Sequence, residues 1–219
     1  MDKKVKTAEL YESIPEILKD LFKHEYPWEI LPLIKTYTAE IIKNHPKGYI
    51  LLKEDVLIGE NVTVSPTATI EGPAIIASGT EIRPGAYIRG SVIISENCVV
   101  GNSTELKNCV LLEKVQVPHY NYVGDSILGK KAHMGAGSIC SNFKADGKNI
   151  VVRGQTNYET GLRKMGAMLG DGADIGCGCV LNPGTVIGKR TSVYPLTSLR
   201  GVFPADCIIK SADNIVKRI

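Results

Sequence analysis

The residues best suited to chemistry lie between positions 105 and 146 of this 219-residue chain. Among them, His119 follows Pro118 in the string PHYNYVGD. An imidazole with an unperturbed pKa of ~6.5 can take a proton from an amine at neutral pH, and an amine must lose that proton before it attacks a thioester. We therefore expect His119 to be the general base of an acyl transfer. A surface histidine at a chain corner is an equally good interpretation.

Charged residues on either side of His119 suggest partners for the ring and for a ligand. Glu105 and Asp125 carry carboxylates that could orient the imidazole. Arg83 and Lys107 precede His119 at outward-facing positions, where basic side chains can hold a phosphate group. Solvated surface charge is the more ordinary interpretation of these two cations when spacing alone is considered.

The histidines and cysteines do not form a metal-binding pattern. His24 and His45 lie near the N-terminus, which leaves only His119 and His133 for a zinc site of three histidines. The cysteine pair at 177 and 179 has no second pair at zinc spacing. We predict that no metal is required, and that all six cysteines are reduced thiols, namely Cys98, Cys109, Cys140, Cys177, Cys179 and Cys207.

The elements that must position these residues show a six-residue repeat. A helix cannot use this period, because six residues turn ~600° at 3.6 residues per turn, and a two-sided strand alternates every second residue. A β-solenoid explains it: each hexapeptide is a short strand and a corner, and three of them close a triangular coil. The repeat consists of aliphatic residues spaced six apart, at Ile58, Val64, Ile70, Ile76, Ile82, Ile88, Ile94, Val100, Leu106 and Leu112, and again at Leu169, Ile175, Leu181, Ile187, Val193 and Leu199.

Residues 1–48 lack this period. Apolar residues recur there at three- and four-residue steps from Leu10 to Leu21 and from Trp28 to Ile41, which predicts two amphipathic helices. We expect them to cap the first coil, as terminal caps do in repeat proteins. Contact with another subunit or partner is the alternative.

The repeat falters after Leu112, where its phase slips by one residue. Residues 141–166 have no hexapeptide phase and are expected to leave the coil as a functional excursion. The predicted organisation is a helical cap at 1–48, a solenoid at 49–205 that contains this excursion, and a C-terminal tail at 206–219.

Composition argues against several classes of protein. A formal net charge of +3 is too small to indicate a nucleic-acid partner by itself. No apolar run reaches the ~18 residues of a membrane span, and the N-terminus lacks the apolar core of a signal peptide. We expect a cytoplasmic protein that binds neither nucleic acid nor membrane.

Several ordered strings carry a resemblance to a known family. EIRPGAYI, VGNSTELKN, PHYNYVGDSILG and MGAGSICSNF resemble, in this order, the acetyltransferase domain of bifunctional glucosamine-1-phosphate N-acetyltransferase/uridylyltransferase. The later string GLRKMGAMLGDGADIGCGCVLNPGTVIG is similar to archaeal-type sugar-1-phosphate nucleotidylyltransferases with the same tail. The resemblance covers residues 50–205. It implies an all-β solenoid of the left-handed parallel β-helix type, a homotrimer with sites between subunits, and acetyl-CoA as co-substrate.

The resemblance also assigns acceptor residues one by one. His119 falls on the catalytic base that deprotonates the sugar amine. Arg83 and Lys107 fall on residues that bind the sugar phosphate, and Tyr122 and Asn142 fall on positions that contact the sugar. These matches imply an amino-sugar 1-phosphate as the acceptor.

The coenzyme positions follow in the same way. Ala136 falls where a backbone group meets the acetyl-CoA thioester, and Cys177 falls on a later acetyl-CoA contact. Arg163 and Lys164, in the excursion, are expected to reach the phosphates of coenzyme A. His133 stands at a substrate-binding position where bacterial relatives carry asparagine.

We therefore expect an acetyl-CoA-dependent N-acetyltransferase for an amino-sugar 1-phosphate. The nucleotidyltransferase half of the family is missing from these 219 residues, so uridylyl transfer is not expected of this chain. Two alternatives stay open. One is a non-catalytic solenoid that assembles with a separate nucleotidyltransferase, and the other is an acyltransferase for a nucleotide-linked amino sugar.

Overall fold

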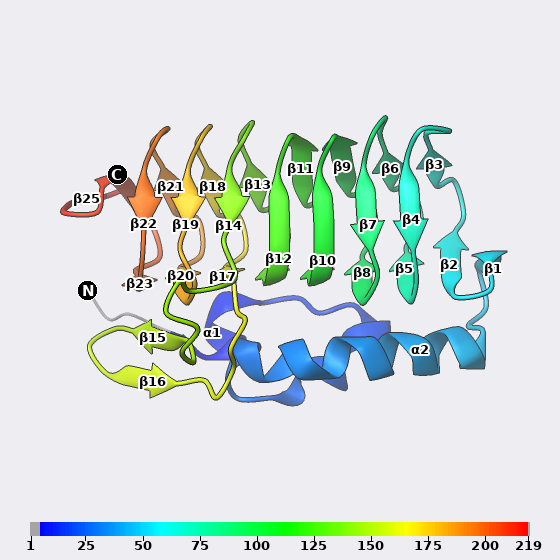
Figure 1. The fold of residues 1–219 in the computed structure, drawn as a ribbon, viewed down its shortest axis with the longest axis horizontal. Helices are drawn as coiled ribbons and strands as arrows, with labels where there is room; N and C mark the ends of the chain where they lie inside the picture. The colour runs from blue at the N-terminus through cyan, green and yellow to red at the C-terminus, as the bar shows by residue number, and fades with distance from the viewer. Residues whose placement is uncertain (1–4, 219) are drawn as a thin grey trace.

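The computed structural model describes residues 5–218, and most of this chain forms one parallel β-solenoid (Figure 1). A full coil contributes a strand to each of three faces. The first face contains β3 (Thr63–Val64), β6 (Glu81–Ile82), β9 (Val99–Asn102), β11 (Gln116–His119), β13 (His133–Met134), β18 (Asp174–Ile175), β21 (Ser192–Val193) and β24 (Cys207–Ser211).

The other two faces share two long strands that bend around a corner, β10 (Glu105–Leu111) and β12 (Tyr122–Leu128). The second face contains their first halves with β4 (Thr69–Glu71), β7 (Tyr87–Arg89), β14 (Ile139–Cys140), β19 (Val180–Leu181) and β22 (Ser198–Leu199). The third face contains their second halves with β2 (Val56–Gly59), β5 (Ala74–Ile76), β8 (Val92–Ile94), β17 (Ala167–Leu169), β20 (Thr185–Ile187) and β23 (Val202–Phe203).

The predicted aliphatic ladder lines the inside of the coils. Ile88 and Leu106 occupy paired positions on neighbouring coils, and neither side chain is exposed to solvent. Each buried residue of this size stabilises the fold by ~1.5–3 kcal/mol. Small residues fill the corners, where Thr104 Oγ1 donates a hydrogen bond of 3.0 Å to the carbonyl of Val117. The predicted fold class, a left-handed parallel β-helix, is confirmed.

The predicted phase slip is a shortened coil. Ile82 pairs with Val100, 18 residues later, but Val100 pairs with Val117, only 17 residues later. The register is kept because the missing residue is taken from a corner and not from a strand. His119 therefore lies on a coil that is one residue shorter than its predecessors.

The N-terminal segment differs from its prediction. The structure has α1 (Thr7–Leu10), three 3₁₀ turns at Glu16–Leu18, Leu21–Lys23 and Pro27–Leu33, and one longer helix, α2 (Ile34–Asn44). The predicted helix from Leu10 to Leu21 is wrong, because Pro15 lacks a backbone N–H and disfavours helical geometry in the residue before it. Pro32 similarly delays the start of α2.

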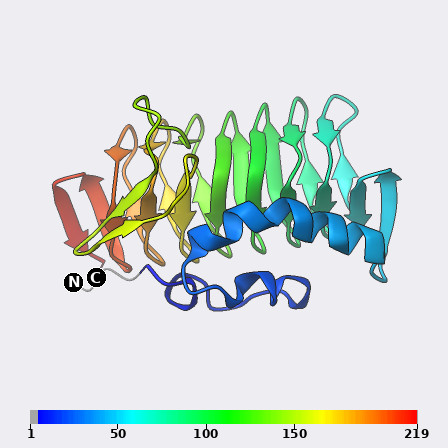
Figure 2. The same ribbon diagram turned by 60° about the horizontal axis from the view of Figure 1, so that its bottom comes forward.

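The position of this segment also differs from the prediction. It lies along the third face and does not cap the first coil, as Figures 1 and 2 show. At the first coil the chain instead forms β1 (Tyr49–Lys53), which pairs antiparallel with β2. The covered surface is a column of outward-facing aliphatic side chains on successive coils, Leu57, Ile75, Ile93, Val110, Ile127, Met168, Val186 and Val202.

The excursion packs beside the N-terminal segment. Its strands β15 (Val151–Arg153) and β16 (Asn157–Glu159) form a hairpin. Tyr158 from this hairpin lies 5.8 Å from the ring of Trp28 and 5.4 Å from that of Tyr26, and these two rings stack at 4.9 Å. We call residues 5–48 together with 141–166 the flank.

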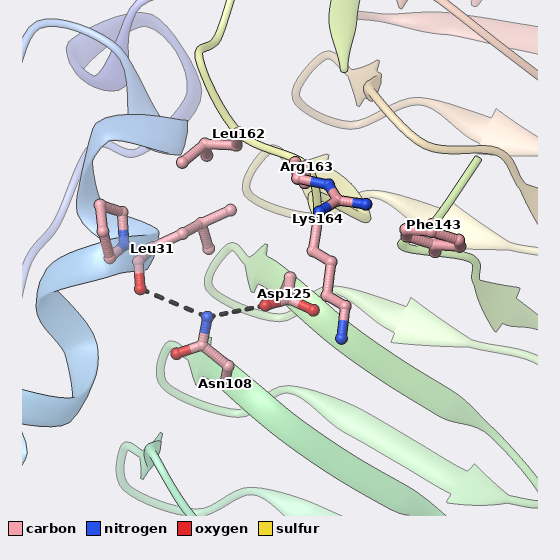
Figure 3. Close-up of a pocket in the computed structure, with 8 residues that line it drawn as sticks. Leu31, Asn108, Asp125, Phe143, Leu162, Arg163 and Lys164 are labelled. Atoms are coloured by element: carbon pink, nitrogen blue, oxygen red, sulfur yellow. Dashed lines mark hydrogen bonds between the residues drawn. The ribbon is translucent and has the colours of Figure 1, made fainter. Parts of the chain in front are cut away.

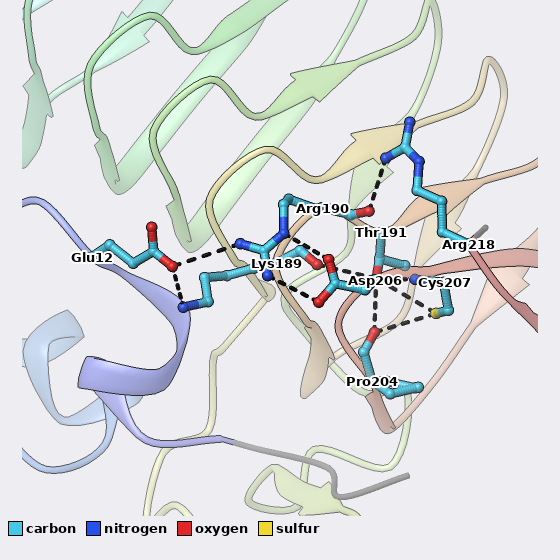
Figure 4. Close-up of polar contacts among 8 residues, drawn as sticks. All are labelled: Glu12, Lys189, Arg190, Thr191, Pro204, Asp206, Cys207 and Arg218. Carbon is cyan, nitrogen blue, oxygen red and sulfur yellow. Dashed lines mark hydrogen bonds and ion pairs between the residues drawn. The ribbon is translucent and has the colours of Figure 1, made fainter.

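Polar contacts hold the start of the flank to the later coils. Both carboxylate oxygens of Asp171 accept backbone N–H groups, from Glu12 and Lys130, at 2.8 Å. Burial raises the pKa of Asp171. The Glu12 carboxylate binds the Lys189 ammonium at 2.6 Å, and this hydrogen bond lowers the pKa of Glu12 (Figure 4).

The last described residues continue the solenoid. β24 pairs with β21, and β25 (Asn214–Lys217) returns antiparallel to β24, so much of the segment expected as a tail is strand. The prediction of reduced cysteines is confirmed, because all six are free thiols. Burial raises the pKa of Cys98 and Cys140 to about 12. No helix within residues 5–218 is long and apolar enough to span a membrane.

Candidate active site

His119 lies at the corner where β11 ends and the chain turns from the first face to the second. Its carbonyl accepts the N–H of Gly137 at 3.0 Å, which places Ala136 beside it on the next coil. The carbonyl of Ala136 accepts the N–H of Gly178 at 2.8 Å, which places Cys177 on the coil after that. His119, Ala136 and Cys177 therefore stack on successive coils, and we call these three residues the corner column.

The corner column is open to solvent. All three of its residues are exposed. Within residues 5–218 the backbone N–H of Ala136 has no hydrogen-bond acceptor, and the His119 ring has no hydrogen-bond partner. The column thus offers an exposed imidazole beside an unused N–H donor.

Asn121, which the sequence analysis did not single out, fixes the backbone of this corner. It is 2% exposed, its Oδ1 accepts the N–H of His119 at 3.1 Å, and its Nδ2 donates to the carbonyl of Gly135 at 2.8 Å. The side chain therefore ties the coil of His119 to the coil of Ala136. The only sequence signal for this role is an asparagine two residues after the histidine.

The expectation that Glu105 or Asp125 orients the His119 ring is wrong. Glu105 binds Arg89 at 2.7 Å on the second face. Asp125 lies farther along, at the corner between the second and third faces, where it binds Lys107 at 3.1 Å. The coil geometry sends these carboxylates away from the end of β11.

Asp125 gathers the polar side chains of the second face. It is 4% exposed and accepts hydrogen bonds from Lys107 Nζ, from Asn108 Nδ2 at 2.8 Å and from Asn142 Nδ2. Asn142 Nδ2 also lies 3.2 Å from the hydroxyl of Tyr122, whose pKa is raised chiefly by burial. Three residues predicted to bind the acceptor, Lys107, Tyr122 and Asn142, are thus brought together around a carboxylate.

A groove of about 340 Å³ opens over this cluster. Its lining includes Arg89 and Lys164 in addition to the three predicted residues, and Phe143 forms one side. Sequence analysis missed Arg89. The available signal was its position 18 residues before Lys107, which is one full coil and hence the adjacent place on the same face.

Other predicted residues lie apart from this cluster. Arg83 follows β6 on the first face and pairs with Glu81 at 3.1 Å. His133 also lies on the first face, where its Nδ1 contacts Asp174 at 2.8 Å. Arg163 and Lys164 lie at the second-face groove and its neighbouring pocket, on the acceptor side of the corner.

Within residues 5–218, no group of three or more histidine, cysteine, aspartate or glutamate residues is arranged to hold a metal ion. The potential ligands are dispersed because the two histidines on the coils, His119 and His133, occupy different positions along the first face. The site is therefore built from cations, amides and hydroxyls, which suit an anionic sugar ligand.

Comparisons with known proteins support the resemblance. The family described as the GMPPB C-terminal domain matches residues 70–159. The chain is 36% identical over 98 residues to the bifunctional protein GlmU of Methanococcus maripaludis strain C5, a match that covers 45% of this chain and 24% of that protein. It is 34% identical over 97 residues to the bifunctional sugar-1-phosphate nucleotidylyltransferase/acetyltransferase of Sulfurisphaera tokodaii, covering 44% of this chain and 24% of that one.

Among solved structures, a hexapeptide transferase family protein from Anaplasma phagocytophilum aligns with a TM-score of 0.49 and 16% identity, over 75% of this chain and 85% of that one. The sequence matches to the curated relatives cover only about a quarter of their length. The similarity therefore concerns the repeat region, and this chain resembles the acetyltransferase part of these bifunctional proteins.

Proposed function

We propose that this chain is an acetyl-CoA-dependent N-acetyltransferase whose acceptor is an amino sugar with a 1-phosphate. The observation that carries the proposal is the relation of two features on one coil. His119 ends β11 in the corner column, and Tyr122, three residues later, begins the strand that enters the basic groove. A sugar phosphate held in the groove would present its amine toward the corner.

The corner column supplies the groups that this transfer needs. The neutral amine attacks the thioester carbonyl, so that an N–C bond forms and the C–S bond breaks. His119 takes the proton that the nitrogen loses and passes it to the departing thiolate. The unused N–H of Ala136 would stabilise the oxyanion of the tetrahedral intermediate. Cys177, next in the column, would contact the coenzyme.

The groove supplies the acceptor contacts. Lys107 and Arg89 hold positive charge over the second face, and Lys164 adds another cation from the excursion. Tyr122 and Asn142 offer a hydroxyl and an amide for the sugar ring. Arg83 and His133 would reach the acceptor from a neighbouring subunit, because they lie on the first face.

A homotrimer with sites between subunits belongs to the same proposal. Tyr120, directly after His119, is 65% exposed, and Leu196, at the matching corner of a later coil, is 85% exposed. Apolar side chains of this size on neighbouring corners favour burial against another surface. Sedimentation should give a trimer for the wild-type chain and monomers for Leu196→Arg, with loss of activity in that variant.

The central test is thiol release from acetyl-CoA with glucosamine 1-phosphate and a panel of other amino-sugar phosphates. His119→Ala should lower turnover by ~10²–10⁴-fold, the range for a general base. His24→Ala is the matched control, because His24 is an exposed residue of the N-terminal segment. Undiminished turnover in His119→Ala would refute the role of His119. No thiol release with any acceptor would favour a non-catalytic solenoid that assembles with a nucleotidyltransferase.

A further inference from the structure

A second pocket adjoins the groove and is not used by the transfer described above. It has a volume of about 430 Å³ and lies between the N-terminal segment and the excursion. Leu31 and Pro32 come from the N-terminal segment, and Leu162 comes from the excursion. Figure 3 shows Leu31 and Leu162 on one side, Phe143 on the other, and the Lys164 side chain extending between them. We call this pocket the flank pocket.

The flank pocket and the groove form one continuous depression. Phe143 and Lys164 line both of them. Asp125 in the flank pocket contacts Lys107 at 3.1 Å, and Lys107 lines the groove. A ligand held by its phosphate in the groove would therefore have room for a further group in the flank pocket.

The charges along this depression leave an excess of two cations. Arg89 is paired with Glu105, and Lys107 is paired with Asp125. Arg163 and Lys164 have no carboxylate within 4.0 Å among residues 5–218. Two cations without partners, side by side in the sequence, fit a diphosphate better than a single phosphate.

The walls of the flank pocket suit a flat, mostly apolar group with polar edges. Leu31, Pro32, Leu162 and Phe143 provide apolar surface. Asn108 stands at the floor, where its Nδ2 donates to Asp125 at 2.8 Å and to the carbonyl of Leu31 at 3.3 Å. Its Oδ1 receives no donor from residues 5–218 and so remains an acceptor for a hydroxyl or N–H group.

We infer that the flank pocket binds the nucleoside of a nucleoside diphosphate, so that the acceptor is a nucleotide-linked amino sugar. The diphosphate would lie along Lys107, Lys164 and Arg163, and the nucleoside would lie between the N-terminal segment and the excursion. Coenzyme A also contains a nucleoside diphosphate. The acceptor is the better source, because the pocket joins Lys107, Tyr122 and Asn142, whereas Ala136 and Cys177 lie at the other corner of the second face. This inference rests on the proposed function for the transfer itself, but not for the binding.

Direct titration tests the binding. UDP and ADP are the probes, and pyrophosphate is the matched anion without a nucleoside. At least one nucleoside diphosphate should bind about tenfold more tightly than pyrophosphate, a difference of ~1.4 kcal/mol. Leu162→Ser should remove this advantage and leave pyrophosphate binding unchanged, and Lys164→Ala should weaken both. Leu52→Ser, at an exposed leucine of β1, is the control. Equal binding of pyrophosphate and both nucleotides would overturn the inference.

Kinetics separate the acceptor from the coenzyme. Leu162→Ser should raise the KM for UDP-glucosamine severalfold and leave the KM values for glucosamine 1-phosphate and acetyl-CoA unchanged. A rise in the KM for acetyl-CoA, with coenzyme A displacing UDP, would assign the pocket to the coenzyme and overturn the inference. If no acceptor is acetylated but UDP still binds in a Leu162-dependent way, the proposed function fails and the nucleotide pocket stands.

Discussion

The coils and the flank are held together by different kinds of contact. A coil pairs in register with the coil before it and the coil after it, and it buries one aliphatic residue per hexapeptide. The flank has no such repeat, and it depends on residues far apart in the chain, such as Trp28 against Tyr158. Coil stability is therefore a sum over neighbours, whereas the flank docks as a single unit. The proposed base lies on the coils, and the flank pocket exists only where the flank is docked.

Removal of a coil side chain should have the largest effect. Ile88→Ala removes a fully buried residue that contacts the neighbouring coil, and this change should cost ~2–5 kcal/mol of unfolding free energy. Urea unfolding followed by far-UV circular dichroism and by the fluorescence of Trp28, the single tryptophan, measures both regions. Both signals should move to lower urea, because the flank needs the coils as its support.

The same substitution in the flank should separate the two signals. Ile30→Ala also truncates a fully buried isoleucine, but this one packs on the outside of the third face. The cavity cost of ~2–5 kcal/mol then falls mainly on docking, so the Trp28 transition should move further than the circular dichroism transition. If the two transitions remain superimposed in both variants, the flank and the coils form one cooperative unit and the comparison fails.

Asp125 joins the two regions, and its replacement should have an intermediate effect. Asp125→Asn places an amide donor where two amides and an ammonium now donate to a carboxylate, at a cost of ~1–3 kcal/mol. Asp174→Asn is the control at an exposed carboxylate that contacts His133, where ~0–1 kcal/mol is expected. Equal midpoints for the two variants in thermal unfolding would mean that the Asp125 cluster adds nothing to the junction.

Acid should release the flank with the smallest effect. The pKa of Glu12 is lowered by Lys189, so its stabilising contribution is complete above its unfolded pKa of ~4.3 and is lost as the pH falls through the folded value. Asp171, whose pKa is raised by burial, has the opposite slope and offsets part of this loss. Trp28 fluorescence between pH 6 and pH 3 should change less in Glu12→Gln than in the wild type. A steeper change in the variant would show that Lys189 does not hold the flank.

The solenoid could be predicted because a repeat states the same contact many times. One register error would move every aliphatic residue of the ladder out of the interior, so period and side-chain type suffice for the fold. The position of His119, Ala136 and Cys177 on successive coils follows from the same register. The column from Leu57 to Val202 on the third face was also visible in the sequence as outward-facing apolar residues, and it marks the surface that the flank covers.

The amino-acid sequence by itself thus determined the coils, the corner that carries His119 and the place of the excursion along the chain. Only the tertiary structure decided that the N-terminal segment lies along the third face, that Asp125 binds Lys107 and not the His119 ring, and that Leu31 meets Leu162 across a pocket. The reason is physical. Contacts between coils recur at a fixed spacing of about one coil, whereas each contact of the flank occurs once, between residues that no period relates.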